Sequence, residues 1–293
     1  MKRISVLFLL ISIFTLSLNA KVRPADKILT YKTVDNISLK LHMFYPPGEV
    51  KETLPAIVFF YGGGWVKKGM SQFERQAVYF AKRGIVAILA DYRTKNPNKT
   101  TPFDAVSDAK SAIRYLKANA NKLNIDSSKI IAAGGSAGGH LAAATALINS
   151  YDDPSDNLSI SSKPQALVLY NPVIDNSENG YGYERIGDEY KSFSPLHNIR
   201  KDAPPTIIFL GTKDKYIPVE TIKEYQRKMS EVGSLCKVYL YNNQQHGFFN
   251  FKREPRNPYF SSTLYETDLF LISLGYLTGK PTVKRQIKAD AVF

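Results

Sequence analysis

The chain has 293 residues, of which 44% are hydrophobic and 22% are charged, and its formal net charge is +13. This hydrophobic content excludes a disordered chain, and the length fits one α/β domain with a sizeable core. The Lys and Arg residues are scattered and accompany no known nucleic-acid motif, so we expect no nucleic-acid partner, and a basic surface suited to acidic surroundings such as an anionic polysaccharide.

The first twenty residues differ from the rest of the chain. A basic pair at 2–3 precedes an apolar run over 6–18, and the small residue Ala20 follows. This order predicts a secretory signal peptide over 1–20. An uncleaved membrane anchor is the alternative, but the run is short for a span and is interrupted by hydroxyl residues. We therefore expect an exported protein, periplasmic or extracellular, with no stable membrane span after cleavage.

Strand-like and helix-like segments alternate over residues 21–279, which we interpret as one domain followed by a basic C-terminal tail, 280–293. The expected strands and helices, in chain order, are a strand at 37–43, a strand at 54–60, a helix at 73–81, a strand at 85–90, a helix at 103–116, a strand at 129–133, a helix at 140–148, strands at 166–170 and 206–210, a helix at 219–229, a strand at 235–241 and a helix at 262–274. Repeated strand–helix–strand units predict an α/β fold with a mostly parallel central sheet and helices on both faces.

The stretch IIAAGGSAGGH (130–140) contains a G-x-S-x-G pattern between an expected strand and an expected helix. A serine at the apex of a tight strand-to-helix turn is typical of a nucleophile elbow. Small neighbours are needed there because the turn holds Ser136 in a strained backbone conformation. The pentapeptide alone also fits an ordinary glycine-rich turn, so other residues are needed to distinguish a nucleophile elbow from such a turn.

Two further strand ends carry groups that complete this chemistry. Asp214 follows the strand at 206–210, and His246 follows the strand at 235–241. The chain order Ser136, Asp214, His246 is the order of an α/β-hydrolase triad, each member after its own strand. His246 would take the serine proton, and Asp214 would fix the imidazole tautomer and stabilise its cation. Taken alone, Asp214 would more often cap a turn, and His246 would more often be a surface histidine.

A run of three glycines, Gly62 to Gly64, follows the strand at 54–60. Backbone N–H groups in such a run can point at the oxyanion of a tetrahedral intermediate. A flexible turn is the simpler interpretation, but the run stands in the same sequence as a complete Ser-Asp-His set. We therefore expect the glycine loop to lie beside Ser136.

With these residues in place, the sequence resembles the α/β-hydrolase fold serine esterases, near the hormone-sensitive-lipase-like group and the secreted bacterial acetyl and feruloyl esterases. The resemblance covers nearly all of the chain after the signal peptide and rests on the motifs YGGGW (61–65), ADYR (90–93), DAKSAIRYL (108–116), GGSAGGH (134–140), GTKD (211–214) and HGF (246–248).

The resemblance implies an oxyanion hole made by the backbone N–H groups of Gly63, Gly64 and Ala137. Two positions depart from the family pattern. Tyr61 stands where many relatives have His, which concerns the packing of the glycine loop rather than its N–H groups. Gly135 stands where the lipase-like group often has Asp, which favours the secreted carbohydrate esterases.

The other candidate residues have structural interpretations. His140 lies one turn beyond Ser136 on the expected helix, and His197 lies in the loop before the strand at 206–210. We expect both to be structural, and we expect Asp91 and Arg93 to brace the glycine loop. The sequence contains no H-E-x-x-H or paired-Cys motif, and serine chemistry needs no cofactor, so we expect neither metal nor cofactor.

The segment 172–204 is the main insertion into the expected fold. It carries Tyr181, Tyr183 and Tyr190 among glycine and amide residues, and these rings together with Trp65 are candidate substrate-binding residues. Aromatic faces and amides at an open site suit a bulky polar substrate such as a sugar. The alternative is that the tyrosines only pack the insertion.

The leading hypothesis is an exported serine esterase that hydrolyses acetyl or feruloyl esters on polysaccharides or oligosaccharides through an acyl-enzyme. One alternative is a general short-chain carboxylesterase. Another is a non-catalytic carbohydrate-binding protein with the hydrolase fold, because a fold does not guarantee an activity.

Overall fold

A computed structural model describes residues 23–49, 52–252 and 257–292. The predicted signal peptide, 1–20, lies outside these ranges. Within them, the strands form one nine-stranded sheet in the order β1-β2-β4-β3-β5-β6-β7-β8-β9. The strands are β1 (Lys27–Val34), β2 (Ile37–Phe44), β3 (Leu54–Phe60), β4 (Val86–Ala90), β5 (Ile125–Gly135), β6 (Ala166–Tyr170), β7 (Thr206–Gly211), β8 (Cys236–Tyr241) and β9 (Asp290–Val292).

The centre of the sheet is parallel and its two edges are antiparallel. Strands β4, β3, β5, β6, β7 and β8 pair in parallel, whereas β1, β2 and β9 join antiparallel at the two edges. The parallel strands are buried on both faces, which explains why they appear in the sequence as continuous apolar runs. The predicted α/β-hydrolase fold class is thus confirmed.

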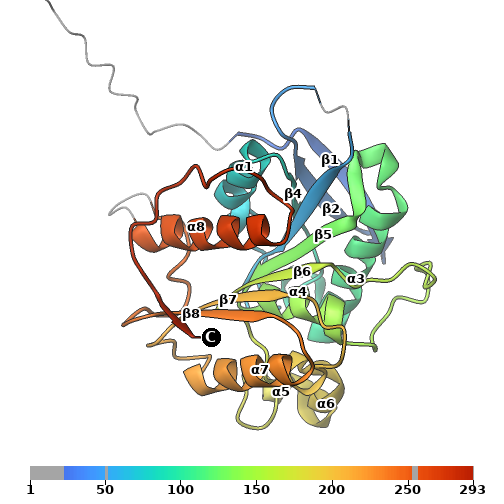
Figure 1. Ribbon diagram of the computed structural model, residues 1–293. Helices are drawn as coiled ribbons and strands as arrows, with labels where there is room; N and C mark the ends of the chain where they lie inside the picture. Colours follow the sequence, from blue (N-terminus) through green and yellow to red (C-terminus); the bar gives the residue numbers. More distant parts are fainter. Residues whose placement is uncertain (1–22, 50–51, 253–256, 293) are drawn as a thin grey trace, which may run out of the picture.

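Helices cover both faces of the sheet (Figure 1). Side chains of α1 (Glu74–Lys82) and α8 (Pro258–Ser273) pack on one face. Side chains of α3 (Pro102–Ala118), α4 (Ala137–Leu147) and α7 (Val219–Glu231) pack on the other.

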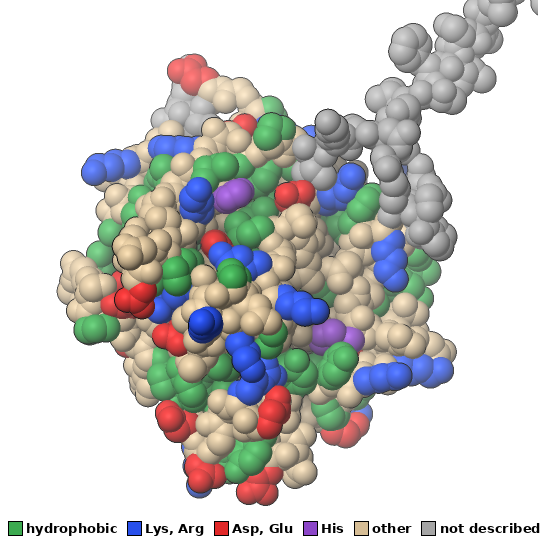
Figure 2. Space-filling view, turned by 180° about the vertical axis from the view of Figure 1, so that it is seen from behind, with side chains coloured by type: hydrophobic (Ala, Val, Ile, Leu, Met, Phe, Trp, Pro, Cys, Tyr) green, Lys and Arg blue, Asp and Glu red, His purple; other side chains and the backbone are tan. Residues whose placement is uncertain are grey.

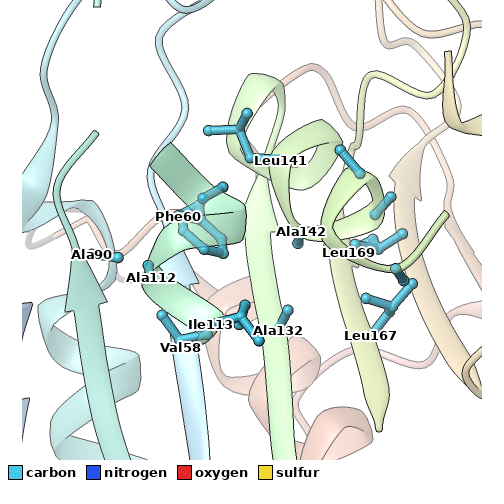
Figure 3. Packing of buried hydrophobic residues seen from close by; sticks show 14 of the residues in the cluster. Val58, Phe60, Ala90, Ala112, Ile113, Ala132, Leu141, Ala142, Leu167 and Leu169 are labelled. Carbon is cyan, nitrogen blue, oxygen red and sulfur yellow. The ribbon is translucent and has the colours of Figure 1, made fainter. Parts of the chain in front are cut away.

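Successive side chains along a strand point to opposite faces of the sheet, so each central strand contributes to the cores on both faces. In β3, Val58 and Phe60 point toward α3 and α4, whereas Ile57 and Phe59 belong to the core under α1 and α8. Figure 3 shows the first of these cores, with Leu141 of α4 and Ile113 of α3 lying over strand residues. This packing holds the carboxyl ends of the parallel strands in one row.

Helix α3 shows how local sequence sets an element boundary. Thr101 is its N-cap, and its hydroxyl accepts a hydrogen bond from the N–H of Asp104 while the Asp104 carboxylate accepts one from the N–H of Thr101. Pro102 occupies the first helical position, where a missing N–H costs nothing. This capping box makes the helix begin immediately after the loop that carries Asp91 and Arg93.

The insertion 172–204 contains two short helices, α5 (Tyr183–Ile186) and α6 (Tyr190–Phe193). The predicted C-terminal tail, 280–293, is not separate from the fold over its described part. The N–H groups of Gln286 and Ile287 donate to the hydroxyl of Ser262 on α8, and β9 adds an edge strand to β8.

Among the described residues, no helix is both long enough and apolar enough to cross a membrane. Figure 2 shows one face of the molecule, where Lys and Arg side chains are spread widely and mixed with Asp and Glu. The net positive charge is thus distributed over this face rather than gathered in one stripe.

Candidate active site

Ser136 lies in a sharp turn between β5, which ends at Gly135, and α4, which begins at Ala137. Its backbone has φ 54° and ψ −121°, a conformation that non-glycine residues rarely adopt. The turn has no room for neighbouring side chains, since a Cβ at Gly134 would lie 2.2 Å from the carbonyl oxygen of Gly138. The glycines of the motif are therefore required by the close approach of the helix to the strand.

The structure brings Ser136, His246 and Asp214 into one hydrogen-bonded chain. His246 Nε2 lies 2.9 Å from Ser136 Oγ, and His246 Nδ1 lies 2.7 Å from Asp214 Oδ2. The serine proton can therefore pass to the imidazole without rearrangement, because both distances are within hydrogen-bond reach.

Asp214 is held in place by its own loop. Its Oδ1 accepts hydrogen bonds from the N–H groups of Tyr216, at 2.9 Å, and Ile217, at 3.1 Å. The Asp214 side chain is fully buried, whereas that of His246 is 22% exposed. Since both oxygens of the carboxylate have partners, the aspartate is oriented to receive Nδ1–H and to stabilise an imidazolium.

The glycine loop lies against Ser136. A Cβ on Gly62 would lie 3.3 Å from the Cβ of Ser136, and the Gly62 N–H donates to Gln72 Oε1 at 2.6 Å. Among the described residues, the N–H groups of Gly63, Gly64 and Ala137 have no hydrogen-bond acceptor. Gly63 and Gly64 line the cavity at Ser136, and Ala137 is the first residue of α4, so all three predicted donors remain available to a ligand oxygen.

Tyr61, the residue that departs from the family pattern, anchors the glycine loop. Its hydroxyl donates to Asp91 Oδ1 at 3.0 Å, and its ring stacks on Tyr92 with centroids 4.2 Å apart. Burial raises the pKa of Tyr61 well above its ordinary value, so the hydroxyl stays a donor. Asp91 also pairs with Lys68 at 2.8 Å, and Arg93 pairs with Asp108.

A cavity of about 310 Å³ opens at Ser136. Sequence reasoning missed five of its side chains, which are Gln72, Asn171, Tyr216, Phe249 and Asn250. Asn171 directly follows β6, so its place at a strand end was a usable indication. Gln72 lies in the short 3-10 helix η1 (Met70–Phe73), and the other three lie in loops whose paths the sequence does not specify.

Two side-chain amides, Gln72 and Asn250, connect the two loops that flank the serine. Gln72 accepts from the N–H of Gly62 and donates through Nε2 to Asn250 Oδ1 at 3.0 Å. Asn250 in turn donates to the carbonyl of Gly247 at 2.9 Å. These hydrogen bonds therefore fix the position of the glycine loop relative to the His246 loop across the cavity.

Of the four candidate substrate-binding residues, the structure places only Tyr181 on the cavity wall. Trp65 is 1% exposed and does not line this cavity, because its ring is packed against His140 and Phe193. Tyr183 and Tyr190 contact each other on the insertion, away from the cavity lining. None of these three residues lines the cavity at Ser136, so their contact with substrate stays a prediction.

His140 and His197 are not in the cavity lining either. His140 is fully buried, and its Nε2 lies 3.0 Å from the carbonyl oxygen of Phe193. Burial lowers its pKa to about 3, so the ring is neutral. His197 packs edge-on against Tyr190 in the insertion. No group of three or more His, Cys, Asp and Glu side chains within the described ranges is arranged to hold a metal ion.

The fold and this site define a hydrolase of the α/β class. A BD-FAE family model matches residues 41–180, and a model of the dienelactone hydrolase family matches residues 168–268. The structure of esterase 2 from Thermogutta terrifontis is 42% identical in sequence, has a TM-score of 0.83, and is covered over 97% of its chain and 88% of this one. The chain belongs to the α/β-hydrolase fold esterases, as the sequence predicted.

Two curated relatives carry names from xylan chemistry. Acetylxylan esterase of Xylanibacter ruminicola is 27% identical over 66% of this chain and 41% of its own length. Endo-1,4-beta-xylanase B of Butyrivibrio fibrisolvens is 28% identical over 64% of this chain and 31% of its own length. The chain thus spans about a third to two fifths of the length of these two relatives.

Proposed function

We propose that the protein is an exported serine esterase that removes short acyl groups, acetyl foremost, from polysaccharides or their fragments. The observation that carries this proposal is the hydrogen-bonded chain Ser136–His246–Asp214 at a cavity with three unoccupied N–H donors. Export rests on the sequence of residues 1–20 alone.

The geometry supports a two-step acyl transfer. Ser136 Oγ attacks the ester carbonyl while His246 Nε2 takes its proton, and the oxyanion that forms lies at the N–H groups of Gly63, Gly64 and Ala137. The C–O bond to the sugar breaks as His246 returns the proton to the leaving oxygen. A water molecule, deprotonated by His246, then attacks the acyl-serine, and the acid is released as the acyl–Oγ bond breaks and His246 returns the proton to Ser136 Oγ.

Support for a carbohydrate substrate comes from the cavity wall. Gln72, Asn171 and Asn250 present amides, and Tyr181 and Tyr216 present rings, whereas no long apolar groove runs among the described lining residues. Sugars combine hydroxyls, which bond to amides, with faces that stack on aromatic rings. The xylan-related names of two relatives agree with this substrate class.

Support for a short acyl group comes from the cavity's modest volume of about 310 Å³. In addition, structures of Thermogutta terrifontis esterase 2 are described with propionate and with butyrate bound. That relative is matched over nearly its whole length, so a general short-chain carboxylesterase is the second candidate. Feruloyl esters, which are larger, rank below acetyl esters.

A panel of substrates tests the proposal. We expect hydrolysis of 4-nitrophenyl acetate and of acetylated xylo-oligosaccharides, with the kcat/KM for acetyl esters above that for octanoyl and feruloyl esters. A long apolar acyl site would add about 0.8 kcal/mol of binding for each methylene and raise kcat/KM with chain length instead. Hydrolysis of simple esters without any deacetylation of oligosaccharides would favour the general carboxylesterase, and hydrolysis of neither would overturn both.

A further inference from the structure

A second hollow, of about 380 Å³, lies beside the cavity at Ser136. The two share the glycine loop, since Gly62 to Gly64 line the cavity and the next two residues, Trp65 and Val66, line the hollow. Its volume falls within the usual range of ligand sites, roughly 300–1,000 Å³. The lining residues are Trp65, Val66, Lys95, Asn96, Lys99, Thr100, Thr101, Pro102 and Arg185.

The wall between the cavity and the hollow is built from aromatic rings and one guanidinium. Tyr181, which lines the cavity, and Trp65, which lines the hollow, have ring centroids 6.0 Å apart. The guanidinium of Arg185 lies 5.3 Å from the centroid of each ring and donates to the carbonyl oxygen of Gly64. A chain of sugar units that spans this wall reaches both sites at once.

The charged side chains that line the hollow are all cationic. Its lining contains three cations, Lys95, Lys99 and Arg185, and no carboxylate. Among the described residues, neither Lys95 nor Lys99 has an acidic partner, and Arg185 pairs with the exposed Glu184. Asp104, in the first turn of α3, accepts hydrogen bonds from Thr101, and its carboxylate lies 3.5 Å from the Arg93 guanidinium.

We propose that this hollow is a subsite for a uronic acid unit of the acylated glycan, with the sugar carboxylate bound by Lys95 and Lys99. The substrate class is then an acidic, partly acetylated polysaccharide, in which a uronate lies near the acetylated sugar. Lys95 and Lys99 are exposed and have no acidic partner among the described residues, so a sugar carboxylate in the hollow gains two charge–charge contacts that a neutral glycan cannot make. Asn96 supplies an amide group for the sugar hydroxyls. This inference rests on the proposed function, because it assigns the substrate of the same site.

Binding measured without turnover tests the subsite separately from the esterase activity. Calorimetry with an unesterified oligosaccharide that carries one uronic acid, and with its neutral counterpart, compares the wild type with the double variant Lys95→Gln/Lys99→Gln. We expect about tenfold weaker binding of the acidic ligand by the variant, a smaller salt dependence, and unchanged binding of the neutral ligand. The matched control is Lys82→Gln/Lys122→Gln, which removes two exposed lysines far from the hollow.

Turnover gives the second readout. The variant should keep the wild-type kcat/KM on 4-nitrophenyl acetate and lose about tenfold in kcat/KM on the acetylated acidic oligosaccharide, through KM. Equal binding of the acidic ligand by wild type and variant, or an equal loss in the control, would overturn the subsite. If the acidic ligand binds through these lysines but no acetylated oligosaccharide is hydrolysed, the subsite stands and the proposed function fails.

Discussion

Asn171 contacts His246 from the side opposite Asp214: its Nδ2 lies 3.4 Å from the Nε2 of the imidazole. The other end of the same amide accepts a hydrogen bond from the N–H of Gly247 at 3.0 Å. Asn171 is 1% exposed and directly follows β6. The imidazole is thus held between a carboxylate at Nδ1 and an amide donor near Nε2, and the donor suits a neutral ring whose Nε2 lone pair receives the serine proton.

Asn171→Asp tests this positioning role. The carboxylate can still accept from Gly247, but a negative charge beside Nε2 favours the imidazolium. We expect kcat to fall about 10- to 100-fold and the acid limb of the kcat/KM profile to move up by about one pH unit. Asn119→Asp, at the end of α3, is the control. An unmoved acid limb would show that Asn171 serves only the fold.

Ser136→Ala tests the nucleophile. Without the hydroxyl only binding and oxyanion stabilisation remain, so kcat on 4-nitrophenyl acetate should drop about 10⁴- to 10⁶-fold. Thermogutta terrifontis esterase 2 is described as phosphorylated by paraoxon, and mass spectrometry after paraoxon treatment should find a modified Ser136 peptide in the wild type alone. Near-normal turnover by the variant would rule Ser136 out.

Apolar runs predicted most of the fold because the parallel strands are buried on both faces. The run at 166–170 coincides with β6. In contrast, β5 begins at Ile125, earlier than the predicted 129: Ile125 pairs with Leu54, and the polar residues between it and Ile130, where pairing with β3 resumes, interrupt the apolar run. Strand β9 was taken for a tail, since three residues at a sheet edge leave no periodic pattern.

The site was predictable to the extent that it follows strand ends. Ser136, Asp214 and His246 each follow a strand, and the parallel sheet brings those ends together. The residues that the sequence missed, such as Gln72 and Asn250, meet through loops from distant parts of the chain. Substrate contact was predicted for Trp65, but its ring packs against His140 and Phe193 and does not line the cavity at Ser136.

Gly135→Ala tests why this chain has a glycine where the lipase-like group often has Asp. A Cβ there would lie 2.7 Å from Cζ of Phe249 and 3.2 Å from Cζ of Phe73, two buried rings that stack 5.7 Å apart. We expect the variant to lose about 1–3 kcal/mol in the free energy of unfolding, measured in urea. In Gly135→Ala/Phe249→Leu the smaller side chain relieves the contact, so the double variant should lose less than the sum of the single losses. If the loss in the double variant equals the sum of the two single losses, a clash between a side chain at position 135 and Phe249 is ruled out.

His140 couples stability to pH. Its folded-state pKa of about 3 lies below the 6.5 expected for the unfolded chain, so between these values the unfolded state binds a proton that the folded state does not. Above pH 6.5 this proton does not lower the free energy of unfolding. As the pH falls from 6.5 toward 3, the free energy of unfolding declines by up to about 1.4 kcal/mol per pH unit. Urea titrations from pH 7 to pH 4 should show a shallower decline for His140→Gln. His197→Gln should change the slope less, because that imidazole keeps water contact.

Tyr181 separates the carbohydrate esterase from the general carboxylesterase. It lines the cavity, and its ring lies edge-on to Tyr216, which in turn lies edge-on to His246 with centroids 5.0 Å apart. A sugar attached to an ester at Ser136 would meet these rings, whereas the alcohol part of a small acetate ester would extend less far. Tyr183 and Tyr190 belong to the same insertion but face each other, so they offer matched controls.

Tyr181→Ala should therefore lower kcat/KM on an acetylated oligosaccharide about tenfold, mainly through KM, and change kcat/KM on 4-nitrophenyl acetate less than twofold. A stacking contact of about 1–1.5 kcal/mol accounts for the tenfold loss. Tyr183→Ala and Tyr190→Ala should treat both substrates as the wild type does, because neither ring reaches the cavity. If Tyr181→Ala impairs both substrates equally, the ring only supports the glycine loop through Trp65 and Arg185. The specificity for sugars would then have to come from the amides of Gln72, Asn171 and Asn250, or be absent.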